Sequence, residues 1–221
     1  MKTVIFDLDG TLADTSRDLI AAANACFRDL GHGDVLDPLA DAATAFRGGR
    51  AMLTLGFSRV APGDASAAIE AQYPRLLQSY GQNIDTHTVM YPGAVEAVEG
   101  LRAAGYRVGV CTNKPEGLAE ELLQRLGVRD LFAALVGADT LPVRKPNPEP
   151  YVETVARVGG DVAQSLLIGD TVTDRETARA AGVPCVLVTF GPEGRAVEAM
   201  APEGLLEDYA ALPEVVRGLI G

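Results

Sequence analysis

Two aspartates near the start of the chain stand where paired carboxylates could do chemistry. Asp7 and Asp9 follow the apolar run Val4-Ile5-Phe6 and are two residues apart. In an extended segment the side chains at positions i and i+2 point the same way, so we expect the two carboxylates to converge. Two neighbouring negative charges repel each other unless a cation lies between them. The pair therefore suggests a magnesium site that serves a phosphate, although a lone Asp-x-Asp is also common in surface turns.

Three further segments place polar residues next to apolar runs or turns. They are Thr112-Asn113 after the run 108–111, Lys145-Pro146 in a proline-rich turn, and Gly169-Asp170 after the run 166–168, with Asp174 four residues further on. Lys145 is one of three lysines in the chain. In an open parallel sheet, ligands bind just beyond the carboxyl ends of the strands. We therefore expect these residues to meet at one edge of a sheet.

In order along the chain, these segments resemble the four motifs of the haloacid dehalogenase-like (HAD) phosphohydrolases. The matching residues are Asp7-Leu8-Asp9-Gly10-Thr11, Thr112-Asn113, Lys145-Pro146 and Gly169-Asp170-x-x-x-Asp174. Each motif is weak alone, but four in the right order are specific, and the resemblance covers essentially the whole chain. It implies a phosphatase that requires Mg²⁺ and forms an aspartyl-phosphate.

The resemblance also implies a role for each acidic residue. Asp7 is the expected nucleophile, and a carboxylate needs no deprotonation at neutral pH. Asp9 is expected to protonate the leaving group and later to take a proton from water. Asp7, Asp170 and the backbone carbonyl of Asp9 are the expected ligands of the metal. Asp174 is expected to support the metal through water or to orient Lys145.

The expected phosphate-binding group combines motif residues with one cation. Its members are Asp9, Gly10, Thr112, Asn113 and Lys145. Lys145 would neutralise charge on the nucleophile and on the transferring group, and Pro146 would hold its backbone extended. A solvated loop lysine is the simpler alternative. We interpret Lys114 as a flanking charge and not as a catalytic residue.

The pattern of apolar runs predicts the elements that position these residues. From about residue 92 onward, strands and helices alternate, which favours an α/β, Rossmann-like parallel sheet with helices on both faces. The expected strands after residue 92 are 106–111, 134–136, 165–169 and 185–188, and the expected helices include 92–105, 115–126 and 172–181.

Residues 14–85 have helical spacing and no convincing strand. A helical block directly after the first motif resembles the cap of the HAD subgroup that includes phosphoglycolate phosphatases and β-phosphoglucomutases. We therefore expect an α/β core of residues 1–13 and 86–221 and an α-helical cap of residues 14–85.

The segment Arg47-Gly48-Gly49-Arg50 lies within the expected cap. A Gly-Gly turn exposes backbone amides, and two guanidinium groups beside it suit a carboxylate. Arg47 and Arg50 are thus candidate substrate-specificity residues, and phosphoglycolate carries such a carboxylate. A helix–helix turn with solvated arginines is an equally open reading.

Composition limits the class of partner. The net charge of −11 disfavours binding to nucleic acid or to anionic membranes. There is no apolar run long enough to span a membrane, and Met1-Lys2 leads directly into the first strand, so we expect no signal peptide and a cytoplasmic protein. Cys26, Cys111 and Cys185 are expected to be small core residues. The expected partner is a small phosphorylated metabolite, with the protein a monomer or homodimer.

Several alternatives stay open at this point. A β-phosphoglucomutase-like phosphomutase shares all four motifs, and the substrate could be a sugar or nucleotide phosphate. A noncatalytic phosphate-binding module is disfavoured because binding alone does not need Asp9. A true haloacid dehalogenase would lack an aspartate at that position, and a phosphonatase would need a cap lysine, whereas residues 14–85 contain none.

Overall fold

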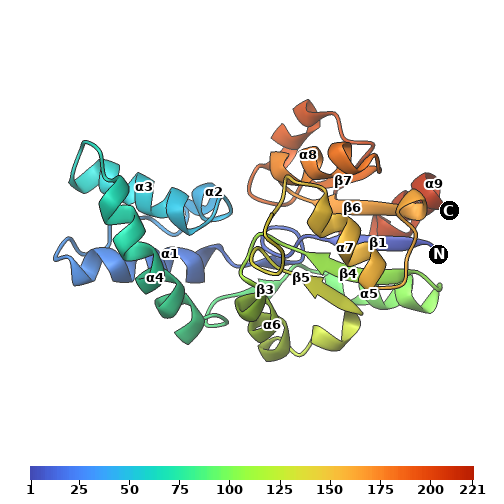
Figure 1. The fold of residues 1–221 in the computed structure, drawn as a ribbon, viewed down its shortest axis with the longest axis horizontal. Helices are drawn as coiled ribbons and strands as arrows, with labels where there is room; N and C mark the ends of the chain where they lie inside the picture. The colour runs from blue at the N-terminus through green and yellow to red at the C-terminus, as the bar shows by residue number, and fades with distance from the viewer. The chain divides into compact units, whose positions relative to one another are not determined.

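The computed structural model describes residues 1–221, which form two compact units (Figure 1). One unit contains Met1–Ala13 and Met90–Gly221, and the other contains Asp14–Val89. The two segments that connect the units pair with each other as a small sheet of β2 (Ala13–Asp14) and β3 (Val89–Met90). The second crossing, between Val89 and Met90, therefore lies slightly later in the chain than residue 86, at which the core is expected to resume.

The first unit is built on a six-stranded parallel sheet. Its strands, in spatial order, are β5 (Ala134–Val136), β4 (Arg107–Cys111), β1 (Thr3–Phe6), β6 (Ser165–Gly169), β7 (Cys185–Val188) and β8 (Gly204–Leu206). Phe6 at the end of β1 is in register with Val110 of β4 and with Ile168 of β6. The segments that follow these three strands therefore begin side by side at one edge of the sheet.

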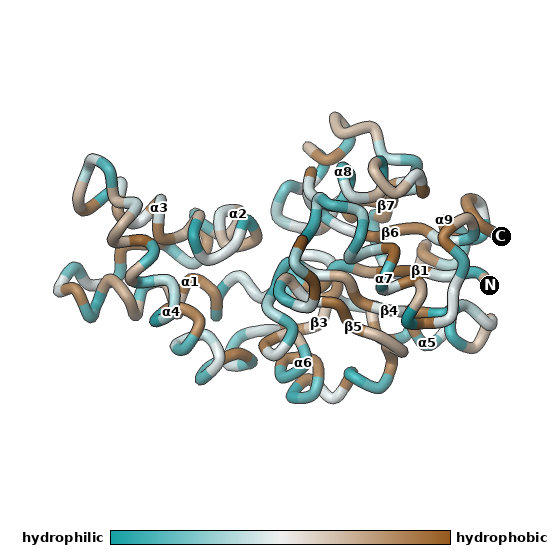
Figure 2. Tube along the Cα trace, viewed as in Figure 1, coloured by the Kyte–Doolittle hydropathy of each residue, from teal (hydrophilic) through white to brown (hydrophobic).

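Both faces of this sheet are buried. The hydrophobic segments gather along the strands (Figure 2), and every residue of β1, β6 and β7 is buried. Alternate side chains of a strand point to opposite faces. Ile5, Leu167 and Leu187 belong to a core cluster with Tyr151 and Ala178, which come from two helices on one face. Buried neighbours such as Val4 and Phe6 consequently face the other side.

Five helices cover the sheet. They are α5 (Ala94–Ala103), α6 (Glu116–Arg125), α7 (Glu149–Arg157), α8 (Val172–Ala181) and α9 (Leu212–Ile220). Helices α7 and α8 contact each other, as do α5 and α9, and all four contact strands of the sheet. The α/β, Rossmann-like architecture expected from the alternating pattern is thus confirmed. The edge strand β8 was not expected, and the C-terminal region is not wholly helical.

The second unit is helical. Its helices are α1 (Ser16–Asp29), α2 (Ala42–Ala45), α3 (Gly49–Val60) and α4 (Ser66–Gln82). The rings of Phe27 and Phe57 meet edge to face at 5.2 Å between centroids. The buried carboxylate of Asp18 accepts hydrogen bonds from the backbone amides of His87 and Thr88, which ties the start of α1 to the end of the unit. No helix anywhere in the protein combines the length and the apolar character needed to cross a membrane.

Candidate active site

Three buried carboxylates lie together at the carboxyl edge of the sheet. Asp7 directly follows β1, Asp170 directly follows β6, and Asp174 lies in the first turn of α8. One oxygen from each lies within 4.8 Å of the others. The grouping results from topology, because β1 and β6 are neighbours and the amide of Asp7 continues the pairing by donating to the carbonyl of Ile168 at 2.8 Å.

Asp174 is fixed by the beginning of α8. Its Oδ2 accepts hydrogen bonds from the hydroxyl of Thr171 at 2.8 Å and from the backbone amide of Thr171 at 3.1 Å, as part of a capping box. Gly169 makes this approach possible, because a Cβ there would lie 2.3 Å from the Cβ of Asp174. Asp174 is completely buried, so it is not a solvated helix-capping acid.

Lys145 joins two of these carboxylates. Its Nζ lies 2.6 Å from Oδ1 of Asp174 and 3.1 Å from Oδ1 of Asp7, and its side chain is only 2% exposed. Burial alone would lower the pKa of Lys145, but the carboxylates of Asp174 and Asp7 outweigh burial and raise it. Lys145 therefore stays charged. With both oxygens of Asp174 engaged, this residue orients Lys145.

The remaining carboxylate atoms suit a cation. Burial raises the pKa of Asp7 to about 6, with Lys145 opposing the shift, and burial also raises the pKa of Asp170. Oδ1 of Asp170 accepts a hydrogen bond from Thr11 at 2.9 Å, whereas its Oδ2 is buried without any hydrogen-bond partner. A buried, unsatisfied carboxylate oxygen is costly. This donor set consists of oxygens alone and fits Mg²⁺.

Asp9 is not one of the three carboxylates that group around Lys145, although its charge adds to the effects of burial and Asp174 that raise the pKa of Asp7. Strand β1 ends at Phe6, and Gly10 takes a left-handed conformation with φ of 83° in the turn that follows. Oδ1 of Asp9 accepts a hydrogen bond from Nζ of Lys114 at 2.7 Å. The Asp9 carboxylate is therefore absent from the three-carboxylate group. In this turn the attraction of the buried Lys114 ammonium holds the Asp9 carboxylate.

The segment after β4 supplies the other motif residues. Thr112 is buried, and its hydroxyl oxygen accepts the amide of Lys114 at 3.2 Å. Asn113 is exposed and donates its side-chain amide to the carbonyl of Lys145 at 3.0 Å, so it also holds the Lys145 loop. Burial raises the pKa of Cys111 to about 12, which keeps this thiol neutral and unreactive.

Comparison with known proteins identifies the family. Residues 4–188 match the model of the haloacid dehalogenase-like hydrolases. The chain belongs to this family. It is 38% identical to a phosphoglycolate phosphatase of Rhodospirillum rubrum over 96% of this chain and 89% of the relative. It is also 38% identical to a phosphoglycolate phosphatase of Caulobacter vibrioides, over 99% of this chain and 92% of that protein. A crystal structure of a predicted phosphoglycolate phosphatase from Haemophilus somnus 129PT superposes with a TM-score of 0.85 at 25% identity, covering 97% of both chains.

Two arginines of this HAD hydrolase are candidate substrate-specificity residues. Arg47 lies in a turn after α2 and Arg50 in the first turn of α3, and both are exposed. Nε and Nη2 of Arg50 donate to the two carboxylate oxygens of Glu70 at 2.7 and 2.9 Å. The Arg50 guanidinium also lies 3.7 Å above the ring centroid of Tyr73. Arg50 thus already has two partners within the helical unit.

The sequence alone does not predict the contacts that some residues make in the site. Lys114, which the sequence suggests is a flanking charge, is buried against Asp9. Thr11 orients Asp170, and the hydroxyl of Tyr209 donates to the carbonyl of Thr11 at 2.7 Å. The scarcity of lysine was a usable signal for Lys114, because it directly follows Thr112-Asn113. No local signal connects Tyr209 with Thr11.

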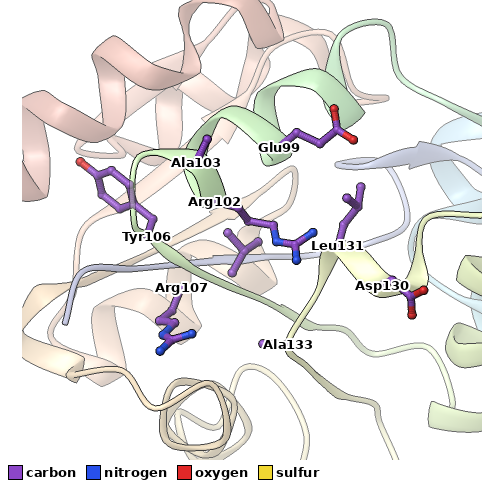
Figure 3. Close-up of a pocket in the computed structure, with 9 residues that line it drawn as sticks. Glu99, Arg102, Ala103, Tyr106, Arg107, Asp130, Leu131 and Ala133 are labelled. Atoms are coloured by element: carbon purple, nitrogen blue, oxygen red, sulfur yellow. The ribbon is translucent and has the colours of Figure 1, made fainter.

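A hollow of about 540 Å³ lies elsewhere on the sheet (Figure 3). Figure 3 shows Arg102 from the end of α5, Tyr106 from the turn after it, Arg107 from the start of β4, and Asp130 from the segment before β5. Because the strands are parallel, this hollow lies at the amino edge of the sheet. It is lined by charges of both signs and contains none of the residues expected in the catalytic group.

Proposed function

We propose that this HAD hydrolase is a Mg²⁺-dependent phosphatase that hydrolyses phosphoglycolate through an aspartyl-phosphate. Its membership among phosphoric monoester hydrolases follows from the family and from the named relatives. The single observation that supports the chemistry best is the buried grouping of Asp7, Asp170 and Asp174 around Lys145. A solvated acidic patch would not need a buried ammonium.

Asp7 is the proposed nucleophile. The amide of Leu8 donates to its Oδ1 at 2.8 Å and Lys145 lies beside the same oxygen, so the carboxylate is held in one orientation. In the first step, an Asp7 oxygen forms a bond to phosphorus while the bond from phosphorus to the leaving oxygen breaks, and Asp9 gives that oxygen its proton. In the second step, water attacks phosphorus, Asp9 takes a proton from the water, and Asp7 leaves as a carboxylate with release of inorganic phosphate.

The proposed metal ligands are the carboxylates of Asp7 and Asp170 and the backbone carbonyl of Asp9. The partnerless Oδ2 of Asp170 supports this assignment. When bound, Mg²⁺ supplies positive charge that offsets the crowded carboxylates and the transferring phosphate. Asp174 contributes indirectly, since its oxygens already accept from Lys145 and Thr171.

Gly10, Thr112, Asn113 and Lys145 are proposed to bind the phosphate oxygens, together with the segment at Asp9. Lys145 would also stabilise charge that builds up during transfer, because its ammonium is preorganised and closed to water. Donors that are already fixed need no reorganisation when the reaction occurs.

Phosphoglycolate is the proposed substrate because relatives named phosphoglycolate phosphatase match nearly the whole chain. Arg47 and Arg50 remain the proposed contacts to its carboxylate. The test is a panel of phosphate esters assayed with Mg²⁺ and reported as kcat/KM. We expect phosphoglycolate to exceed sugar and nucleotide phosphates by at least about tenfold, a modest difference for a charged group in a specific site. Equal values across the panel would reject phosphoglycolate, and phosphoryl return to a sugar would indicate a mutase.

A further inference from the structure

The Asp9 carboxylate is paired with a lysine that follows β4, and it is not a member of the group formed by the other three acids. Strand β1 lies between β4 and β6 in the sheet. Asp7 extends the pairing with β6 and groups with Asp170 and Asp174, whereas Asp9 binds Lys114, which follows β4. Two aspartates separated by one residue thus have partners that follow the two different strands flanking β1.

Lys114 is a fixed partner. Its side chain is 3% exposed and that of Asp9 is 17% exposed, so the carboxylate lies nearer to solvent than the ammonium does. The Lys114 backbone is held at both ends, because its amide donates to Thr112 and its carbonyl accepts the amide of Ala138 at 2.9 Å. A lysine with an anchored backbone and a buried ammonium thus holds the Asp9 oxygen at 2.7 Å.

We propose that Lys114 is a positioning residue that holds the Asp9 carboxylate toward the leaving group and out of the three-carboxylate group. Without this ion pair, Asp9 could turn toward the cation site and become one more carboxylate ligand. It would then no longer face the oxygen that needs a proton. This inference rests on the proposed role of Asp9 in proton transfer and adds a residue that acts through it.

The placement predicts a dependence on the leaving group. An alkoxide, as in phosphoglycolate, needs a proton when it departs, whereas 4-nitrophenolate is stable without one. Since kcat/KM reports the steps up to departure of the leaving group, loss of a positioned acid should harm the first substrate much more than the second. A general disturbance of the site would harm both equally.

The test uses Lys114→Met, Lys114→Gln in case the first variant folds poorly, and Lys114→Arg for rescue. We expect Lys114→Met to lower kcat/KM for phosphoglycolate about 100-fold and that for 4-nitrophenyl phosphate about fivefold or less, and Lys114→Arg to recover most of the loss. Lys2→Met is the matched control, because Lys2 is exposed at the opposite edge of the sheet and should leave both rates unchanged. Circular dichroism confirms folding.

A double-mutant cycle shows whether Lys114 acts through Asp9. In the Asp9→Asn background, Lys114→Met should have no further effect on phosphoglycolate, since the group that it positions is already lost. Additive losses, or equal losses on both substrates, would overturn the proposal. A loss on phosphoglycolate but not on 2-hydroxyethyl phosphate, which carries a hydroxymethyl group in place of the carboxylate, would also overturn it and make Lys114 a substrate contact.

The same experiment separates this inference from the proposed function. If the unmodified protein hydrolyses none of the phosphate esters, or if Asp9→Asn is fully active, the proposed function fails and Lys114 has no acid to position. If the unmodified protein is active and Asp9→Asn is impaired, the outcome of the double-mutant cycle tests the positioning role of Lys114 alone.

Discussion

Nζ of Lys145 lies 2.6 Å from Oδ1 of Asp174, and neither side chain is more than 2% exposed. This ion pair binds the loop after β5 to the first turn of α8. The ammonium of Lys145 is one positive charge, whereas the group contains three carboxylates. Folding therefore leaves excess negative charge in a buried place, which one divalent cation would offset.

Replacing Lys145 by Met should destabilise the metal-free protein. It leaves Asp7 and Asp174 buried without their cation, and breaking a buried pair costs about 3–5 kcal/mol. We expect a loss of that size in the free energy of unfolding measured in denaturant with a chelator present, and a severe loss of activity. Lys2→Met should change neither. A loss of less than about 0.5 kcal/mol would contradict a buried ion pair.

Asp7→Asn should abolish turnover and preserve the fold. The amide keeps the shape of the side chain and can still accept from Leu8, but it removes the nucleophile. Acid quenching of the unmodified protein during turnover should leave a phosphoryl group on Asp7, detectable by mass spectrometry of peptides. Full activity in Asp7→Asn would end the covalent mechanism.

Asp170→Asn should weaken Mg²⁺ binding by at least about tenfold, because a hard cation held by few carboxylates depends on each of them. Isothermal titration calorimetry on chelator-treated protein measures this directly. Thr11→Val, which removes the hydrogen bond to Oδ1 of Asp170, should weaken binding less. Asp130→Asn, at the hollow on the amino edge, is the control. Unchanged affinity in Asp170→Asn would place the metal elsewhere.

The sequence predicts the carboxyl edge of the sheet well and the ion-pair partners of its side chains poorly. Apolar runs before Asp7 and Asp170 were enough to predict that these residues meet, because parallel strands end together. The ion pair of Asp9 with Lys114 was not predictable, since the two residues are distant in sequence.

Strand β8 is difficult to predict from the sequence for a similar reason. Gly204-Leu205-Leu206 is short and contains a glycine, so its own sequence gives a weak strand signal. It becomes a strand by pairing with β7, where Val186 is in register with Gly204. Tertiary pairing decides such segments, and local propensity does not.

Acid should weaken the helical unit through Asp41. Arg59 donates to both oxygens of Asp41 at 2.7 Å and lowers the pKa of Asp41 below its ordinary value of 3.8. A lowered folded-state pKa means that the stabilisation is complete above the ordinary value and is lost as the pH falls through the folded value. Because Arg59 is 41% exposed, we expect about 1 kcal/mol. Unfolding from pH 6 down to pH 3, compared with Asp41→Asn, measures this; an identical pH dependence in the two proteins would contradict it.

Arg50 has two possible uses that one pair of variants can separate. The finding is that Arg50 binds Glu70 through two hydrogen bonds and stacks on Tyr73. If Arg50 also binds the substrate carboxylate, Arg50→Ala should lower kcat/KM for phosphoglycolate by about ten- to a thousandfold, and that for 4-nitrophenyl phosphate far less. Glu70→Gln removes the internal partner and keeps the guanidinium, so it should preserve or improve activity on phosphoglycolate. If Arg50 serves folding alone, both variants should destabilise the protein in thermal unfolding, and Arg50→Ala should affect both substrates equally. That second pattern would mean that Arg50 gives no support to phosphoglycolate as the substrate.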